Sequence, residues 1–115
     1  MSIIIKNGHL IEPTAKISEP MDVLIDGKFV KQIGNNLSGD EVIDAKGCVV
    51  CPGLVDIHVH FREPGFESKE TIASGSRSAA RGGFTSVVTM ANTRPVIDSA
   101  GMVEFVNRRA RETSL

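Results

Sequence analysis

Residues 54–65 read Leu-Val-Asp-Ile-His-Val-His-Phe-Arg-Glu-Pro-Gly, and they decide the fold class of this chain. From residue 55 to residue 59, every second residue is a β-branched apolar one, and the positions between them are polar. Because successive side chains of a strand point to opposite faces, the pattern predicts a strand with one apolar and one polar face. The turn dipeptide Pro52-Gly53 precedes this strand, and we expect a domain boundary there.

The residues after this strand alternate between helical and strand patterns. Small and apolar residues at helical spacing predict a helix over 68–81, which Gly82-Gly83 would end because glycine suits the left-handed position after a helix. Residues 84–90 are rich in Val and Thr, which predicts a second strand, and Asp98 is the expected N-cap of a last helix. The stripe of that helix expected to face the core consists of Met102, Phe105, Val106 and Arg109. The order strand–helix–strand–helix predicts βα units and a parallel sheet.

Short strands dominate the part before the boundary. Residues 3–5 form a β-branched run closed by a turn pair, residues 42–47 predict another strand followed by a turn, and Val49 and Val50 begin the next extended stretch. Residues 23–30 predict a hairpin around Asp26-Gly27, because a type I′ turn needs positive φ at both central positions. Such a short β-rich segment buries little core alone. We therefore expect an α/β chain with part of a small β-sandwich over 1–52 and βα units over 53–115.

Length and charge narrow the function classes. The 115 residues are too few for a complete (β/α)₈ barrel, which needs about 250. A formal net charge of −1 argues against nucleic acid or an anionic membrane as the main partner. No apolar run reaches the roughly 18 residues of a membrane span, and two cysteines are too few for a disulfide framework. These features favour a soluble, cytoplasmic chain.

His58 and His60 are the candidate metal ligands. Two imidazoles two residues apart on a strand project from the same face, and neutral imidazole nitrogen is a good ligand for Zn²⁺. They lie at the carboxyl end of the strand, where α/β sheets and barrels carry their active sites. The alternative is two ordinary polar residues on a solvated face, which the apolar opposite face makes less attractive.

Arg62 and Asn92 are the candidate substrate-binding residues. The guanidinium of Arg62 continues the polar alternation past His60 and could form a bidentate pair with a substrate carboxylate. Asn92 follows the second predicted strand, whose carboxyl end lies beside that of the first in a parallel pair. The alternatives are a surface salt bridge for Arg62 and a loop or cap role for Asn92.

Three further residues have simpler interpretations. Cys48 and Cys51 could join the two histidines in a four-ligand zinc site, but residues three apart on a strand point to opposite faces. We therefore expect both cysteines to be buried as small hydrophobic residues. His9 has no partner in the sequence and is expected at the surface.

Residues 49–98 resemble the amidohydrolase superfamily and, within it, the dihydroorotases of the long bacterial type. The matching segments are residues 52–60, 61–65, 69–72, 79–85 and 92–96. The histidine pair alone marks only the superfamily, whereas the Phe-Arg-Glu-Pro-Gly continuation together with Asn92-Thr93 is more specific. Ala91 departs from the family, which more often has proline there. Because these enzymes begin with strands of a small β-sandwich, the resemblance covers essentially the whole chain.

The resemblance implies a role for each matching residue. His58 and His60 would ligate the more buried zinc of a two-zinc site, and His60 would also line the substrate pocket. Arg62 and Asn92 would hold the carboxylate of dihydroorotate or carbamoyl aspartate, which a zinc-activated hydroxide interconverts in pyrimidine biosynthesis. The other metal ligands and the proton-shuttling aspartate come from later barrel strands. The resemblance therefore implies the N-terminal fragment of a longer enzyme, with no catalytic residue of its own and no activity alone.

Two alternatives stay open at this point. The parent could be another cyclic-amide amidohydrolase, such as an allantoinase or a hydantoinase, or a catalytically silent relative. A small non-enzymatic zinc module could use Cys48, Cys51 and the two histidines. The parent could also assemble as a homo-oligomer or with another enzyme of the pyrimidine pathway.

Overall fold

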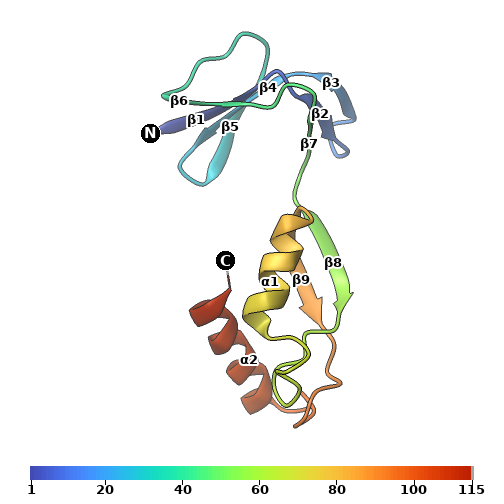
Figure 1. Cartoon of the computed structure of the whole chain (residues 1–115). Helices are drawn as coiled ribbons and strands as arrows, with labels where there is room; N and C mark the ends of the chain where they lie inside the picture. The colour runs from blue at the N-terminus through green and yellow to red at the C-terminus, as the bar shows by residue number, and fades with distance from the viewer. Residues whose placement is uncertain (115) are drawn as a thin grey trace. The chain divides into compact units, whose positions relative to one another are not determined.

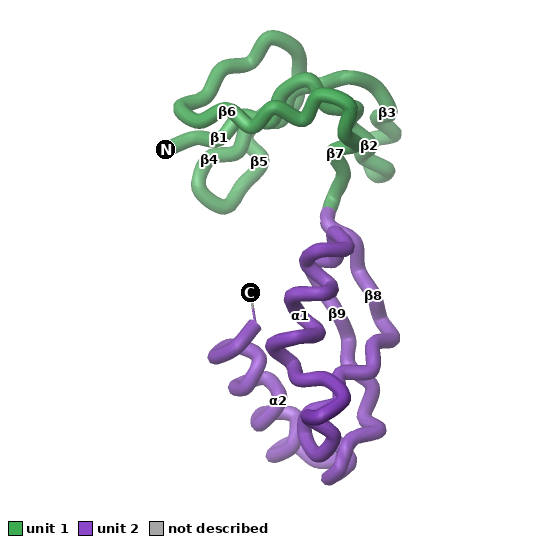
Figure 2. The backbone as a smooth tube through the Cα atoms, viewed as in Figure 1, with its two compact units in different colours: residues 1–52 green, residues 53–115 purple. Residues whose placement is uncertain are grey.

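The computed structural model of the chain describes residues 1–114. It divides into two compact units, Met1–Pro52 and Gly53–Leu115, which we call unit 1 and unit 2. Figure 1 shows that unit 1 consists of strands, whereas unit 2 alternates strands with helices. Figure 2 colours the two units separately.

Unit 1 contains two sheets of short strands. The four-stranded sheet has the order β5-β4-β1-β6, and the three-stranded sheet has the order β3-β2-β7. The strands are β1 Ser2–Lys6, β2 His9–Glu12, β3 Ile17–Pro20, β4 Asp22–Asp26, β5 Phe29–Gly34, β6 Glu41–Asp44 and β7 Val49–Val50. Ile4, Leu10, Val23 and Ala45 are its buried apolar residues. Two sheets over a small apolar core agree with the β-sandwich architecture predicted for this part.

The predicted hairpin is present, but its turn lies one residue later than expected. Asp26 still pairs with Phe29, so the two-residue loop is Gly27-Lys28. Gly27 has φ +60°, whereas Lys28 does not have positive φ. A turn of type II′ needs glycine only at its first central position, so the type I′ turn around Asp26-Gly27 was wrong.

Cys48 and Cys51 are both exposed, which contradicts their predicted burial. They flank β7, a two-residue strand that lies at the end of the three-stranded sheet. An edge strand has a neighbouring strand on one side only, so the residues beside it have fewer cross-strand neighbours than those of a central strand. His9 is exposed as predicted, and its Nε2 lies 3.1 Å from Ser18 Oγ.

Unit 2 consists of two successive βα units, as predicted. They are β8 Leu54–Val59, α1 Ile72–Arg81, β9 Phe84–Thr89 and α2 Ala100–Thr113. Strands β8 and β9 pair in parallel, and α1 packs against both β9 and α2. Phe61 and Ile72 are its buried apolar residues. A Cβ on Gly75 would overlap the ring of Phe61, which lies in the loop between β8 and α1. The absence of a side chain at position 75 therefore lets α1 approach that loop closely.

Both helices begin later than the sequence suggested. Helix α1 starts at Ile72 rather than residue 68, because Thr71 and Ser74 cap its first turn reciprocally. Helix α2 is capped by Ser99 rather than Asp98; the Ser99 hydroxyl accepts a hydrogen bond from Met102 N. The end of α1 agrees with the prediction: Gly83, which follows the cap Gly82, has φ +83°. The predicted stripe of α2 is its half-buried face.

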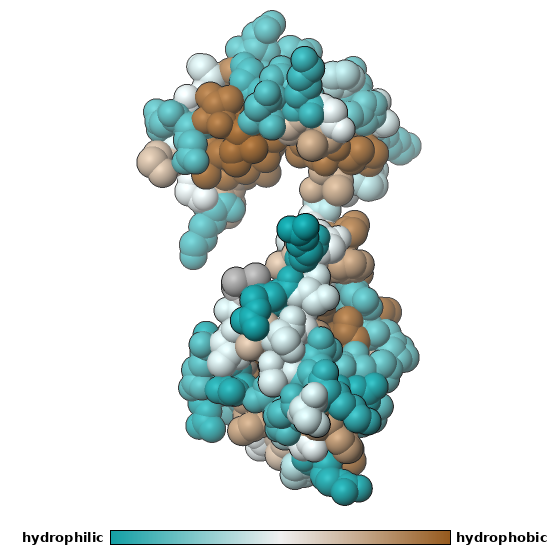
Figure 3. All heavy atoms as spheres, in the orientation of Figure 1, coloured by the Kyte–Doolittle hydropathy of each residue, from teal (hydrophilic) through white to brown (hydrophobic). Residues whose placement is uncertain are grey.

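Apolar side chains remain exposed on both units. On the strands of unit 2, Val55, Ile57 and Val88 are more than half exposed. In unit 1 the exposed set includes Phe29, Val30, Val42 and Ile43. Figure 3 shows brown, apolar side chains at the surface of unit 1, whereas the visible face of unit 2 is more hydrophilic. None of the helices within residues 1–114 has the length and apolar character to cross a membrane.

Candidate functional site

The candidate site lies where β8 and β9 end. The amide of Met90, just past β9, donates a hydrogen bond of 2.8 Å to the carbonyl of Val59, the last residue of β8. The two strands therefore finish at the same level. His60 follows β8 directly, and Asn92 is three residues beyond the end of β9. The parallel pairing thus places chain segments 32 residues apart at one edge of the sheet.

His58, His60 and Asn92 come together at this edge. The rings of His58 and His60 have centroids 5.1 Å apart and planes inclined by 66°. His60 Nδ1 lies 3.1 Å from Asn92 Oδ1. An amide oxygen can only accept, so Nδ1 carries the proton in this contact, and in the neutral ring Nε2 keeps its lone pair. All three side chains are exposed and accessible to a ligand.

The spacing of the two histidines fits a shared metal ion. A zinc–nitrogen bond of about 2.1 Å, with about 1.1 Å from nitrogen to ring centroid, places each centroid about 3.2 Å from the metal. At a tetrahedral angle of about 109°, two such centroids are about 5.2 Å apart. The observed 5.1 Å is compatible with this value, and it is also the separation of an ordinary edge-to-face ring contact. The hydrogen bond on Nδ1 of His60 is also the kind of support that metal-ligating histidines have.

The histidine pair supplies only part of a metal site. Within residues 1–114, no three side chains among His, Cys, Asp and Glu gather closely enough to hold a metal ion. The structure therefore lends no support to the alternative of a self-contained four-ligand zinc module. Any complete metal centre at these histidines needs further ligands.

Arg62 lies in the loop that leads from β8 to α1. It is half-buried, and its carbonyl accepts a hydrogen bond of 2.9 Å from Phe66 N. Its guanidinium takes part in none of the ion pairs formed among the described residues 1–114. The surface salt bridge that was the alternative for Arg62 is therefore absent from that part of the chain.

The two loops that carry the candidate residues brace each other. Arg94 N, in the loop after β9, donates to the carbonyl of Pro64 at 3.0 Å. Gly65 has φ +97°, and a Cβ there would overlap the backbone of Arg94. The Arg94 guanidinium also lies 6.0 Å from the centre of the Phe66 ring, within cation–π range. Glycine at position 65 thus allows a close backbone approach that joins the two loops.

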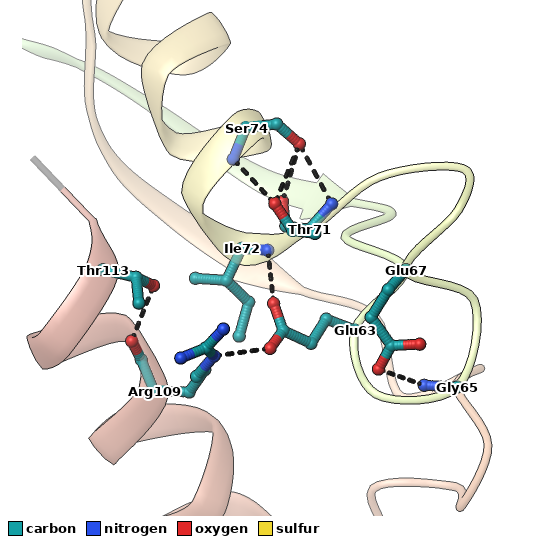
Figure 4. A network of polar contacts seen from close by, with 8 residues as sticks. All are labelled: Glu63, Gly65, Glu67, Thr71, Ile72, Ser74, Arg109 and Thr113. Carbon is teal, nitrogen blue, oxygen red and sulfur yellow. Dashed lines mark hydrogen bonds and ion pairs between the residues drawn. The ribbon is translucent and has the colours of Figure 1, made fainter.

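Glu63 is a residue of this site that sequence reasoning left without a role. Its carboxylate is 6% exposed; it accepts from Ile72 N at 2.9 Å and from Arg109 Nε at 2.6 Å (Figure 4). The hydrogen bond and charge of Glu63 raise the pKa of Arg109. Arg109 is 46 residues away on α2, so no local pattern could have shown this pair. The carboxylate of nearby Glu67 accepts from Gly65 N, which lowers the pKa of Glu67.

Solved structures with this fold define the class of protein. An L-hydantoinase (dihydropyrimidinase) from Arthrobacter aurescens matches 94% of this chain with a TM-score of 0.80 and 29% identity, over 24% of its own length. A D-hydantoinase structure matches 99% of this chain with a TM-score of 0.78 and 32% identity, over 25% of its own length. The chain thus has the architecture of about a quarter of a hydantoinase.

Sequence comparison assigns the family within that class. A family model described as "Dihydro-orotase-like" matches residues 47–115. The dihydroorotase of Pelobacter propionicus is 48% identical over 100% of this chain and 28% of its own length. That of Lactococcus lactis is 54% identical over 86% of this chain and 24% of its own length. The chain belongs to the dihydro-orotase-like family, and it spans about a quarter of the length of these curated relatives.

Proposed function

We propose that this chain forms the N-terminal quarter of a dihydroorotase. The enzyme would convert N-carbamoyl-L-aspartate into dihydroorotate and water, and the reverse, in pyrimidine synthesis. The observation that carries the proposal is the cluster of His58, His60 and Asn92 at the ends of two parallel strands, in a chain 48% identical to a dihydroorotase. Under this proposal, unit 1 is part of a small β-sandwich domain and unit 2 begins a (β/α)₈ barrel.

The exposed apolar residues support a larger parent protein. Val55 and Ile57 on β8 and Val88 on β9 are more than half exposed, and each strand of this two-stranded sheet has one neighbour only. Open sheet edges and large exposed apolar residues are typical of surfaces that further structure covers. In a barrel, further strands would pair with both edges and further helices would cover the outer face.

His58 and His60 would hold a metal ion, which we propose is Zn²⁺, with two ions in the complete site. When bound, such a metal supplies an activated water nucleophile and polarises the ring amide carbonyl. Asn92 would favour the His60 tautomer with a free Nε2, because its Oδ1 accepts a hydrogen bond from Nδ1–H. The described residues supply no complete metal site, so the remaining ligands and the proton-transfer group would come from elsewhere in the full-length enzyme.

Arg62 and Asn92 would bind the substrate carboxylate, and His60 would line the same pocket. The guanidinium of Arg62 presents a planar pair of donors that matches a carboxylate. Asn92 uses Oδ1 for His60 and keeps its two Nδ2 protons for a ligand. Two donor groups on the same carboxylate would fix the orientation of the ring relative to the histidines.

The test uses full-length enzyme that carries this sequence, with N-carbamoyl-L-aspartate and dihydroorotate as substrates. We expect turnover in both directions, and we expect Arg62→Ala to raise KM by roughly 100-fold, because a charge-assisted bidentate pair is lost. Arg62→Lys should not restore KM, since lysine lacks the planar fork. The exposed Arg77→Ala on α1 is the control and should behave as wild type.

Hydantoinase activity is the second candidate, and the fold match to hydantoinases favours it. An unsubstituted hydantoin carries no ring carboxylate, so Arg62 would then have no substrate group to bind. Turnover of hydantoin or of allantoin, with no turnover of dihydroorotate, would replace the proposed function by this alternative. The absence of turnover with all these substrates in a metal-loaded full-length protein would indicate a silent relative.

A further inference from the structure

Glu63 joins three parts of unit 2 through one buried carboxylate. One oxygen accepts from the backbone of Ile72 at the start of α1, and the other accepts from the side chain of Arg109 on α2. Figure 4 shows the carboxylate between these two partners, with the loop of Gly65 and Glu67 beside it. Because Glu63 is 6% exposed, water cannot replace either partner without cost.

The loop that holds Glu63 also carries the candidate substrate-binding arginine. Arg62 is the preceding residue, so the position of its Cα follows the backbone that the Glu63 side chain fixes. On the other side of Glu63, the carbonyl of Pro64 accepts from Arg94 in the loop after β9. Residues 62–65 are therefore held by the two helices through a side chain and by the neighbouring loop through the backbone.

We propose that Glu63 and Arg109 are positioning residues, which hold the 62–65 loop so that Arg62 meets the carboxylate of the substrate. The inference rests on the proposed function, since it assumes that Arg62 binds a carboxylate. Neither Glu63 nor Arg109 contacts the substrate in this role. Their effect on binding runs through the placement of Arg62.

The Glu63–Arg109 contact could be purely structural or could position Arg62, and its loss would change different measured quantities in the two cases. A purely structural tie lowers thermal stability and leaves the substrate constants alone. A positioning tie changes KM, and it does so only while Arg62 is present. A misaligned charge-assisted hydrogen bond to the substrate weakens binding by roughly tenfold or more, so the expected effect is large enough to measure.

Helix α2 offers a matched control. Arg111 Nη2 and Glu104 Oε1 form an ion pair of 2.7 Å, nearly as short as the 2.6 Å of Arg109 with Glu63. Both Arg111 and Glu104 are about two-thirds exposed and lie on the same helix, so this pair holds no loop. Arg111→Gln removes an ion pair of the same chemistry without touching the 62–65 loop.

The experiment measures kcat, KM and the calorimetric Kd for N-carbamoyl-L-aspartate, together with Tm, in the metal-loaded full-length enzyme. We expect Glu63→Gln and Arg109→Gln each to raise KM and Kd about tenfold, with kcat within about threefold of wild type. Arg109→Lys keeps the charge but not the planar group, and it should give an intermediate KM. Arg111→Gln should leave KM and Kd unchanged.

The same substitutions in an Arg62→Ala background isolate the route of the effect. If Glu63 acts through Arg62, adding Glu63→Gln to Arg62→Ala should change KM by less than about twofold. An equal KM increase with and without Arg62 would overturn the inference, as would unchanged KM with a lowered Tm in Glu63→Gln and Arg109→Gln. If Glu63→Gln does not fold, the two Arg109 variants decide by the same criteria.

The failure of the proposed function would look different. If Arg62→Ala itself leaves KM and Kd unchanged, then Arg62 does not bind the carboxylate, and the proposed site falls together with the positioning role. If Arg62→Ala raises KM while the Glu63 and Arg109 variants do not, the proposed site stands and only the positioning role is lost.

Discussion

Unit 1 and unit 2 each bury one carboxylate that joins a backbone amide to a cationic side chain. In unit 1, Asp22 accepts from Leu37 N at 3.1 Å and pairs with Lys6 Nζ at 3.3 Å. In unit 2, Glu63 accepts from a backbone amide at 2.9 Å and from a guanidinium at 2.6 Å. The two residues are similarly buried, at 8% and 6% exposure. Both units therefore contain a buried carboxylate that is paired with a backbone amide and a cationic side chain.

The difference lies in what surrounds each carboxylate. Asp22 begins β4, a central strand of its sheet, and its partner Lys6 also donates to the carbonyl of Leu37 at 2.7 Å. That network is closed on itself and ties the segment around Leu37 to the sheet. Glu63 instead lies in the loop after β8, next to Arg62 and three residues beyond the exposed His60. A satisfied polar network stabilises a fold, whereas accessible polar groups at parallel strand ends can bind and act. We therefore expect substitutions at the polar residues of unit 2 to change substrate binding and turnover. Substitution of the buried carboxylate of unit 1 should change only the free energy of unfolding.

His58→Ala in the full-length enzyme should give the largest effect. It removes a nitrogen ligand from the proposed metal site, and no group of three potential ligands among residues 1–114 can compensate. We expect kcat to fall by roughly 100-fold or more and bound metal to fall with it. Metal analysis and steady-state kinetics are the measurements. His9→Ala, at an exposed histidine of unit 1, is the control; full metal content and normal turnover in His58→Ala would remove His58 from the site.

Asn92→Ala, at the same edge of the sheet, should lower kcat/KM by less than His58→Ala lowers turnover. It removes a hydrogen bond to the substrate carboxylate, which costs about 1.5–3 kcal/mol for a charged partner. That loss corresponds to a roughly ten- to 150-fold fall in kcat/KM. Asn92→Asp should be worse, because it keeps the acceptor for His60 but sets a negative charge against the substrate. Asn35→Ala, exposed in unit 1, is the control, and an Asn92→Ala enzyme with wild-type kcat/KM would contradict the role.

Local chemistry made much of the fold predictable, and distance in sequence limited the rest. The end of α1 and the β4–β5 hairpin follow from glycines that supply positive φ, and the neighbourhood of His60 and Asn92 follows from parallel strands. The start of α1 was misplaced because Ser68 and Thr71 both suit an N-cap, and only the hydrogen bonds between Thr71 and Ser74 select Thr71. The exposure of the cysteines depended on β7 being an edge strand, which local pattern does not reveal.

The contacts of the two buried carboxylates could not be predicted either, because their partners lie far away in the sequence. Asp22 and Leu37 are 15 residues apart, and Glu63 and Arg109 are 46 residues apart. Each pair needs the tertiary fold to bring it together. The sequence placed Glu63 in a motif and Arg109 on the inner stripe of a helix, yet nothing local joined them. The candidate ligands were visible in the sequence because they lie on or just after strands, whereas the residues that support them were not.

Asp22→Ala should sharpen the comparison by changing stability alone. The substitution leaves Leu37 N without its acceptor and Lys6 without its counter-ion. Loss of a buried hydrogen-bonded partner costs about 1–3 kcal/mol. We expect a lower free energy of unfolding in denaturant titration and unchanged kcat and KM. Lys31→Ala breaks the exposed pair with Asp26 in the same unit and should cost at most about 1 kcal/mol. A changed KM in Asp22→Ala would break the division between the two units.

Asp44 is expected to have the smallest effect, which is a contribution to stability that depends on pH. Its carboxylate accepts from Asn7 Nδ2 at 2.8 Å and from Lys46 N at 3.1 Å, and these hydrogen bonds lower the pKa of Asp44. Because the pKa is lower in the folded state, the ionised group stabilises the fold above the unfolded pKa of about 3.9. That contribution is lost as the pH falls through the folded pKa, so it disappears on the acid side of about pH 4.

Two variants of unit 1 test this acid dependence through Tm measured between about pH 5 and pH 2.5. Asp44→Asn cannot ionise, so its Tm should fall less steeply with acid than that of wild type. Asn7→Gly removes the strongest hydrogen-bond donor to Asp44 while suiting the positive φ of 64° at position 7, and its acid slope should also flatten. Kinetics at neutral pH should be unchanged in both. Parallel curves of Tm against pH for all three proteins would show that Asp44 contributes nothing to acid stability, because a group with equal pKa in both states cannot couple folding to protons.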